Sequence, residues 1–305
     1  MPAASRTSLL PAWAIAYNAL VWGISWLPLQ HLQGQGLHPL WSTALMYSLP
    51  MLSLLLWRPQ LLRELAGQRD LWWLLLASGL TNACFNWAVA TGDVIRVVLL
   101  FYLMPVWTVF LAWWLLDERP TRSALLRVLL ALAGVVLVLQ PSGGNWRDWQ
   151  LPLPQGQADV LALLGGFFFS CTNVLLNRSS RHSSPPARVL AMFSGGVLLG
   201  SLTAWSMLQL GRMGVTPIPA VEWVWVLQVV LFSLLFVSGN IALQYGSARL
   251  SSHTLSLIML LEVLFASISS AWLGSAQLTL QVLAGGVLVM AAALLAIPRQ
   301  ESAGH

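Results

Sequence analysis

The chain has 305 residues, of which 57% are hydrophobic and only 8% are charged, and its mean hydropathy is +0.74. A soluble domain usually carries about 25% charged residues, so this composition excludes an ordinary soluble protein and indicates one that crosses a membrane several times. The net charge is +5, and all fifteen basic residues are arginines that lie in short groups between apolar runs. That scatter excludes a basic face for nucleic acid, so we expect no nucleic-acid partner.

Apolar runs of membrane-spanning length follow one another along the whole chain. A helix that crosses a bilayer core of about 30 Å needs about 20 apolar residues. The first run follows Arg6, but it is longer than the apolar part of a signal peptide and no convincing cleavage site follows it, so we interpret it as a span. By this measure the sequence predicts ten transmembrane helices, over residues 9–30, 38–57, 71–91, 94–116, 123–140, 158–177, 186–208, 222–246, 250–273 and 277–297.

The arginines test this number of spans, because a wrong number would scramble their distribution between the two sides of the membrane. With ten alternating spans, twelve arginines fall on one side and only Arg96, Arg147 and Arg212 fall on the other. The positive-inside rule then places both termini in the cytoplasm. We expect the protein to lie in the inner (plasma) membrane of the cell. We expect Arg96 and Arg249, which lie at span ends, to reach the lipid headgroups.

The second half of the chain repeats the first at an offset of 158 residues, which aligns Asn82 with Asn240 and Asn86 with Gln244. Each half then holds five spans. Because five is an odd number, the second half must enter the membrane in the opposite direction, which is the inverted repeat of many transporters. The sequence therefore predicts an all-α membrane protein built from two inverted five-helix repeats.

The predicted organisation places the first repeat at 1–145, a periplasmic linker at 146–157, the second repeat at 158–299 and a cytoplasmic tail at 300–305. The connection around the linker is the longest in the chain and is rich in Pro, Gly, Gln and Trp, and we interpret it as the link between the two halves. Two inverted halves suit alternating access, in which a site near the bilayer midplane opens first to one side and then to the other.

One carboxylate, Glu262, lies inside an apolar span. It is roughly 15 Å from the start of the run at 250–273, close to the midplane, where a charged residue costs about 2.5 to 3.5 kcal/mol to insert. It is either a proton-coupling or substrate-binding group, or a protonated acid that hydrogen-bonds a neighbouring helix. At the matching depth of the first half lies Pro105, which lacks a backbone donor and so predicts a helix break.

Other candidate residues are polar or aromatic side chains away from the span ends. Asn82 and Asn86 on the third span, and Asn240 and Gln244 on the eighth, are one helical turn apart, so each span carries a polar stripe. Such a stripe either lines a cavity or hydrogen-bonds another helix. The aromatic candidates for the site are Trp22, Tyr47, Tyr102, Trp107 and Tyr245.

The spans contain none of the patterns that serve catalysis or metal binding. They hold no HExxH motif, no pair of aspartates and no nucleotide-binding loop, and Cys84 and Cys171 both lie inside apolar runs. We therefore expect no metal, no cofactor and no enzyme activity. An intramembrane enzyme that acts on a lipid-linked substrate is the alternative from another class of protein.

Three motifs together resemble the drug/metabolite transporter superfamily, in particular its EamA-type ten-helix members: VWGISW (residues 21–26), YLMPVWTVFLAWWLLDERPT (residues 102–121) and LEVLFASISSAWLGSAQLT (residues 261–279). The resemblance implies a central cavity lined mainly by spans 1 to 4 and 6 to 9. It also implies a secondary transporter, an exporter of a small metabolite such as an amino acid. Proton coupling and proton-independent facilitation or exchange both stay open, as does the oligomeric state.

Overall fold

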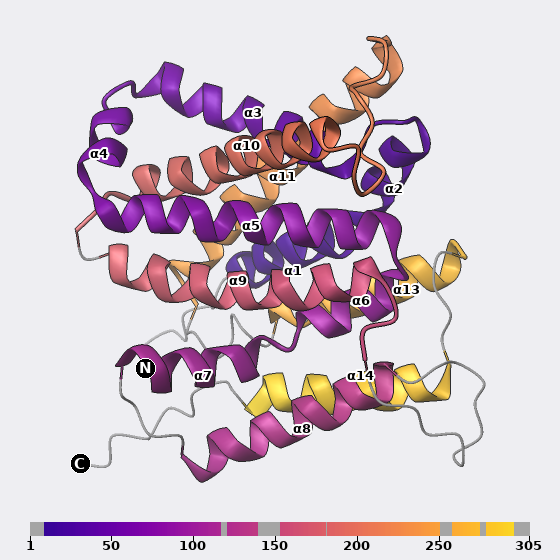
Figure 1. Ribbon diagram of the computed structural model, residues 1–305. Helices are drawn as coiled ribbons and strands as arrows, with labels where there is room; N and C mark the ends of the chain where they lie inside the picture. Colours follow the sequence, from indigo (N-terminus) through magenta and orange to yellow (C-terminus); the bar gives the residue numbers. More distant parts are fainter. Residues whose placement is uncertain are drawn as a thin grey trace.

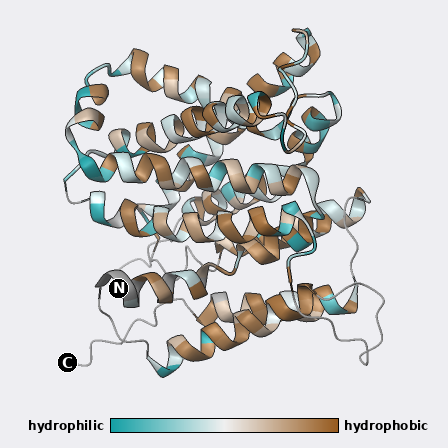
Figure 2. Ribbon diagram, in the orientation of Figure 1, coloured by the Kyte–Doolittle hydropathy of each residue, from teal (hydrophilic) through white to brown (hydrophobic). Residues whose placement is uncertain are grey.

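The computed structural model describes residues 9–116, 121–139, 153–180, 182–250, 258–274 and 279–295, and every regular element in these ranges is an α-helix. Most of the predicted linker and all of the predicted cytoplasmic tail lie outside them. The long helices run roughly alongside one another in stacked rows (Figure 1). Hydrophobic residues dominate the helices, and hydrophilic residues are most frequent near the helix ends (Figure 2).

Five described helices are long and apolar enough to cross a membrane: α3 (Pro39–Trp57), α8 (Arg122–Leu139), α9 (Gln157–Ser179), α10 (Pro185–Gln209) and α11 (Trp223–Ser247). Helix α5 (Arg69–Thr91), with 23 residues, coincides with the third predicted span. The other predicted spans coincide with shorter or interrupted helices: α1 (Leu10–Gly23) with α2 (Trp26–Gly34), α6 (Val94–Phe101) with α7 (Met104–Leu116), α13 (Leu261–Trp272) and α14 (Leu280–Leu295). A short helix, α4 (Leu61–Gly67), lies between α3 and α5. The chain is thus a multi-pass membrane protein.

The first predicted span is not the continuous helix that we expected. It breaks at Ile24 and Ser25, and α2 then continues to Gly34. The cause is Pro28, which has no N–H to donate to the carbonyl of Ile24 four residues earlier. That carbonyl instead accepts a bond from the N–H of Leu27, at 3.1 Å, in a tighter turn.

The fourth predicted span breaks in a similar way at Tyr102 and Leu103, between α6 and α7. Pro105 is the second residue of α7 and cannot donate to the carbonyl of Phe101 four residues earlier. The N–H of Val106 bonds the carbonyl of Leu103 at 2.9 Å, again three residues back. Two proline-associated interruptions therefore lie inside apolar spans.

Close helix crossings at glycines hold the rows together. Helix α5 packs on α9, α10 and α3, while α1 packs on α11 and α13. At the α5–α10 crossing, a Cβ atom on Gly79 would lie 2.5 Å from the carbonyl oxygen of Gly195, and one on Gly195 would lie against the carbonyl oxygen of Leu75. These neighbours are backbone atoms, which cannot rotate away.

We predict that Gly195→Ala destabilises the protein by about 1–3 kcal/mol, because the added methyl group forces two packed helices apart. The measurement is thermal unfolding of the purified protein in detergent. Gly67→Ala is the matched control, since a Cβ on Gly67 meets no atom within 4 Å. Equal unfolding midpoints for Gly195→Ala and the wild type would show that the crossing is looser than described.

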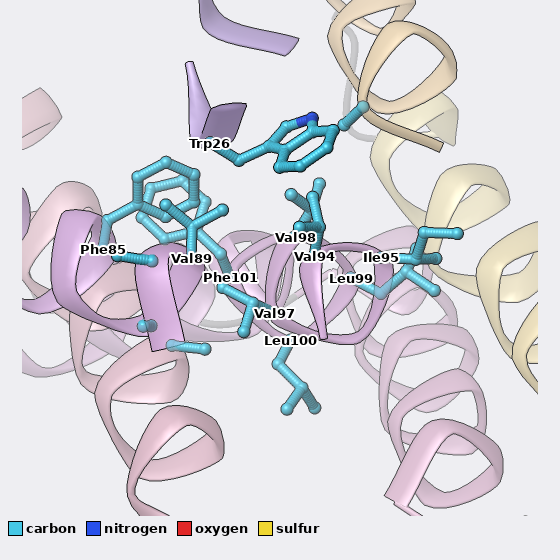
Figure 3. Packing of buried hydrophobic residues seen from close by; sticks show 14 of the residues in the cluster. Trp26, Phe85, Val89, Val94, Ile95, Val97, Val98, Leu99, Leu100 and Phe101 are labelled. Carbon is cyan, nitrogen blue, oxygen red and sulfur yellow. The ribbon is translucent and has the colours of Figure 1, made fainter. Parts of the chain in front are cut away.

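Helix α6 lies at the centre of the main hydrophobic core. Seven of its eight residues are buried, and the exception is Arg96. Figure 3 shows Val94, Ile95 and Phe101 of this helix among Phe85 of α5 and Trp26 of α2. A short helix that is apolar on all sides is buried on all sides. Helix α6 contacts α5, α8, α9, α13 and α14.

Polar contacts join the helix ends that the sequence predicts to lie on the same side of the membrane. At the predicted cytoplasmic side, Glu64 accepts bonds from the N–H of Ser184 at 2.6 Å and from its hydroxyl at 2.8 Å, and Asp70 pairs with Arg178 at 3.3 Å. At the opposite ends, the indole N–H of Trp41 donates to the Thr216 carbonyl oxygen at 3.1 Å. These contacts tie segments of the two halves to each other at both ends.

Arg96 does not reach out to headgroups as we expected. Its side chain is only 15% exposed and pairs with Asp159 of α9, which is 7% exposed. The sequence places the two residues 63 positions apart, on either side of the long connection, and a guanidinium this buried is stable only with such a partner. Arg249 is exposed at the end of α11.

Candidate functional site

Two of the candidate residues meet where α6 ends and α13 begins. The hydroxyl group of Tyr102, the residue that follows α6, donates a hydrogen bond to Oε2 of Glu262 at 3.1 Å. Tyr102 is buried and Glu262, in the first turn of α13, is partly buried. The contact joins residues that are 160 positions apart in the chain and lie in opposite predicted halves.

The break in the first span lies at the same place. Gly23 ends α1, and a Cβ atom on it would lie 2.8 Å from the carbonyl oxygen of Glu262 and 2.6 Å from Cβ of Phe265. Just beyond the break, the indole N–H of Trp26 donates to the hydroxyl oxygen of Ser269 at 3.0 Å. The interrupted first span therefore packs directly along α13 on both sides of its break.

Three helix interruptions thus surround Glu262: the break between α1 and α2, the break between α6 and α7, and the turn at Leu260 that precedes α13. At that turn the N–H of Val263 bonds the carbonyl of Leu260 at 3.2 Å, in the same three-residue pattern as in the other two breaks. Interrupted helices leave backbone N–H and C=O groups without their usual partners inside the membrane. Transporters use such groups, next to a buried acid, to bind ions and polar solutes.

The polar stripe of the third span faces α3. The hydroxyl of Tyr47 donates to Oδ1 of Asn82 at 2.8 Å, and Nδ2 of Asn86 donates to the hydroxyl oxygen of Thr43 at 3.0 Å. These bonds tie α3 to α5. Within the described residues, Oδ1 of Asn86 is buried and has no partner, so this amide oxygen can still accept a hydrogen bond.

Tyr47 and Trp22 are joined through an aromatic side chain that the sequence did not single out. Phe236 of α11 lies edge-on to Trp22, with ring centroids 4.6 Å apart, and edge-on to Tyr47, with centroids 6.2 Å apart. The cluster connects α1, α3 and α11. Trp107 lies apart from it on α7, edge-on to Phe167 at 5.5 Å, and its indole N–H is buried without a partner in the described part of the chain.

The polar stripe on α11 is not part of these contacts. Asn240 is partly buried and Gln244 is exposed. Tyr245 is engaged at the helix end, where the guanidinium of Arg249 lies 4.0 Å above its ring. Of the candidate residues, then, the structure brings Tyr102 onto Glu262, Tyr47 onto Asn82, and Trp22 and Tyr47 onto one shared phenylalanine, and it leaves Gln244 and Tyr245 near one end of α11.

Reasoning from the sequence missed Gly23, Thr43 and Ser269. A glycine two residues before Ser25 and five before Pro28 was a usable signal for a break. The partners Thr43 and Ser269 carried no such signal, because a single hydroxyl in an apolar helix is common and its partner lies on another helix. Among the described residues, no cluster of three or more His, Cys, Asp or Glu side chains is placed to hold a metal ion.

Residues 9–140 match the EamA-like transporter family. Two relatives from Helicobacter pylori, strains J99 and 26695, are each named an uncharacterized transporter and are 24% and 23% identical over 232 and 233 residues, which cover 75% of this chain and 73% of each relative. A solved crystal structure is 20% identical with a TM-score of 0.51 and covers 93% of this chain and 96% of its own, a likeness in fold.

Proposed function

We propose that this chain, whose residues 9–140 match the EamA-like transporter family, is a membrane transporter of the drug/metabolite kind that exports a small metabolite, such as an amino acid, across the inner membrane. The mechanism proposed is alternating access by two inverted five-helix repeats with both termini in the cytoplasm. The observation that carries the proposal is the meeting of three interrupted spans around Tyr102 and Glu262. Interrupted helices near the midplane are where secondary transporters hold their solutes.

The packing of the helices supports the inverted repeat. Exchange of the predicted halves turns the first span into the sixth, the third into the eighth and the fourth into the ninth. Under this exchange the α5–α9 pair becomes the α11–α1 pair, and the α7–α9 pair becomes the α13–α1 pair; all four pairs are in contact. The fifth and tenth spans, α8 and α14, pack on each other reciprocally, since a Cβ on Gly134 and one on Gly285 would each lie 2.7 Å from the other's carbonyl oxygen.

Glu262 is proposed as the group that takes up a proton or the charged amine of a solute. A carboxylate near the midplane needs a partner or a proton, and Tyr102 supplies one hydrogen bond. Burial favours the protonated acid, whereas a bound amine or a donated hydrogen bond favours the carboxylate. The same side chain can therefore alternate between two states as the halves rearrange around it.

The test is uptake by proteoliposomes that contain the purified full-length protein. A panel of isotope-labelled amino acids is offered with and without a pH gradient, and with unlabelled solute inside to detect counterflow. We expect saturable uptake of at least one solute, absent from protein-free liposomes and stimulated by the gradient. Counterflow without a gradient effect would favour the proton-independent exchanger, and a change in the mass of a liposome lipid without solute uptake would favour the enzyme.

A further inference from the structure

A nearly buried ion pair anchors the start of α6. Arg96 donates from Nε to Oδ1 of Asp159 and from Nη2 to Oδ2, both at 2.8 Å. Its Nη1 also donates to the carbonyl oxygen of Val138 in the last turn of α8. Such a bidentate contact restrains the orientation of the guanidinium as well as its position. Arg96 therefore holds the start of α6 against α9 through the ion pair and against α8 through the bond to Val138.

The far end of α6 carries Tyr102. A helix of eight residues is only about 12 Å long, so a shift along its axis at one end moves the other end equally. Apart from Arg96, every side chain of α6 is apolar (VIRVVLLF). Apolar contacts are not directional, so they resist a small sliding motion less than a bidentate ion pair does. The surroundings of these apolar side chains are visible in Figure 3.

The hydrogen bond that would sense such a shift is a long one. The Tyr102–Glu262 distance of 3.1 Å exceeds the usual 2.7–2.8 Å for an O–H···O bond and lies at the edge of the accepted range. An increase of about 0.5 Å would end it. The backbone of Phe101 rests on Gly166 of α9, where a Cβ would lie 2.5 Å from the Phe101 carbonyl oxygen, so α6 lies on α9 along its length.

We propose that Arg96 and Asp159 are positioning residues for the Tyr102–Glu262 hydrogen bond. The ion pair sets the position of α6 along α9, and the position of α6 sets the distance from the Tyr102 hydroxyl to Glu262. This inference rests on the proposed function for the role of Glu262 in transport. It goes further by placing control of Glu262 at the opposite end of α6, at two side chains that bond each other and, through Arg96, the carbonyl oxygen of Val138.

The test reads Glu262 directly and needs no solute. Dicyclohexylcarbodiimide modifies protonated carboxyl groups, and the rate at which it labels Glu262 in the full-length protein in liposomes is followed by mass spectrometry across pH. The infrared carbonyl band that Glu262→Gln removes gives the same midpoint independently. The variants are Asp159→Asn, Tyr102→Phe and the double variant. Asp70→Asn is the matched control, because it removes an Asp–Arg pair whose arginine side chain is 71% exposed.

We expect Asp159→Asn to shift the pH midpoint of Glu262 in the same direction as Tyr102→Phe and by at least half as much. The double variant should match Tyr102→Phe alone, because a residue that acts through Tyr102 has no further effect once the hydroxyl is gone. Asp70→Asn should match the wild type. If Asp159→Asn fails to fold, Arg96→Lys keeps the charge, loses the bidentate geometry and should shift the midpoint in the same direction.

A wild-type midpoint in folded Asp159→Asn or Arg96→Lys protein, or shifts that add in the double variant, would overturn the inference and leave the ion pair a support for folding. The proposed function fails separately. If no solute is taken up but Asp159→Asn still shifts the pH midpoint of Glu262, only the transport proposal fails. If gradient-driven uptake is seen but Asp159→Asn leaves the pH midpoint of Glu262 unchanged, only the positioning role fails.

Discussion

Glu262→Gln is expected to abolish the response of transport to a pH gradient while leaving a folded protein. Glutamine has nearly the same shape and its side-chain oxygen can accept the bond from Tyr102, but it neither binds nor releases a proton. Positioned proton-transfer groups contribute on the order of a hundredfold or more in rate, so we expect gradient-driven uptake to fall by at least that factor. Uptake by proteoliposomes with and without a gradient is the measurement.

The matched control for this variant is Glu64→Gln. Glu64 binds Ser184 at the predicted cytoplasmic ends of the helices, far along the chain from the interrupted spans, so its loss should leave the gradient response in place. Because Glu262→Gln removes an acid from an apolar span, its thermal stability should equal or exceed that of the wild type. The same gradient dependence in Glu262→Gln and wild type would reject proton coupling, and the Tyr102–Glu262 bond would then serve only to join two helices.

The sequence predicted an all-helical membrane protein because each apolar run carries its own signal. The break at Pro105 was predicted from a local rule, the missing N–H of proline. The break at Ile24 has the same cause, the missing N–H of Pro28. It was not predicted because the first run was interpreted from its overall hydrophobicity. Periodicity indicates which residues share a helix face, and mean hydropathy describes a segment as a whole. A break depends on a single residue, so neither quantity reveals it.

Partners across helices could not be predicted in this way. Tyr102 and Glu262 were both candidates from their depth and chemistry, yet nothing local states that they touch, since 160 residues separate them. Asn82 and Asn86 show the converse limit. Their one-turn spacing predicted a shared polar face, but whether that face meets a cavity or another helix depends on α3, which supplies Tyr47 and Thr43. Arg96 was assigned to the headgroups because Asp159 lies beyond the long connection.

Gly23→Ala should reduce transport more than it reduces stability. The added methyl group would lie 2.8 Å from the carbonyl oxygen of Glu262 and 3.1 Å from the backbone nitrogen of Ala266, and neither atom can rotate away. Either α1 retreats or the first turn of α13 shifts, and each movement displaces Glu262 from Tyr102. The cost of such overpacking is about 1–3 kcal/mol, which a folded membrane protein can survive. The measurements are uptake per folded protein and the thermal unfolding midpoint.

Two glycine variants separate this effect from ordinary destabilisation. Gly34→Ala adds a methyl group to α2 where no atom lies within 4 Å, so both transport and stability should match the wild type. Gly195→Ala forces apart two other helices, α5 and α10, and should lower stability while uptake per folded protein persists. Of these three glycines, only Gly23 packs against the backbone of Glu262. Wild-type uptake by Gly23→Ala would therefore mean that the approach of α1 to α13 has no part in transport.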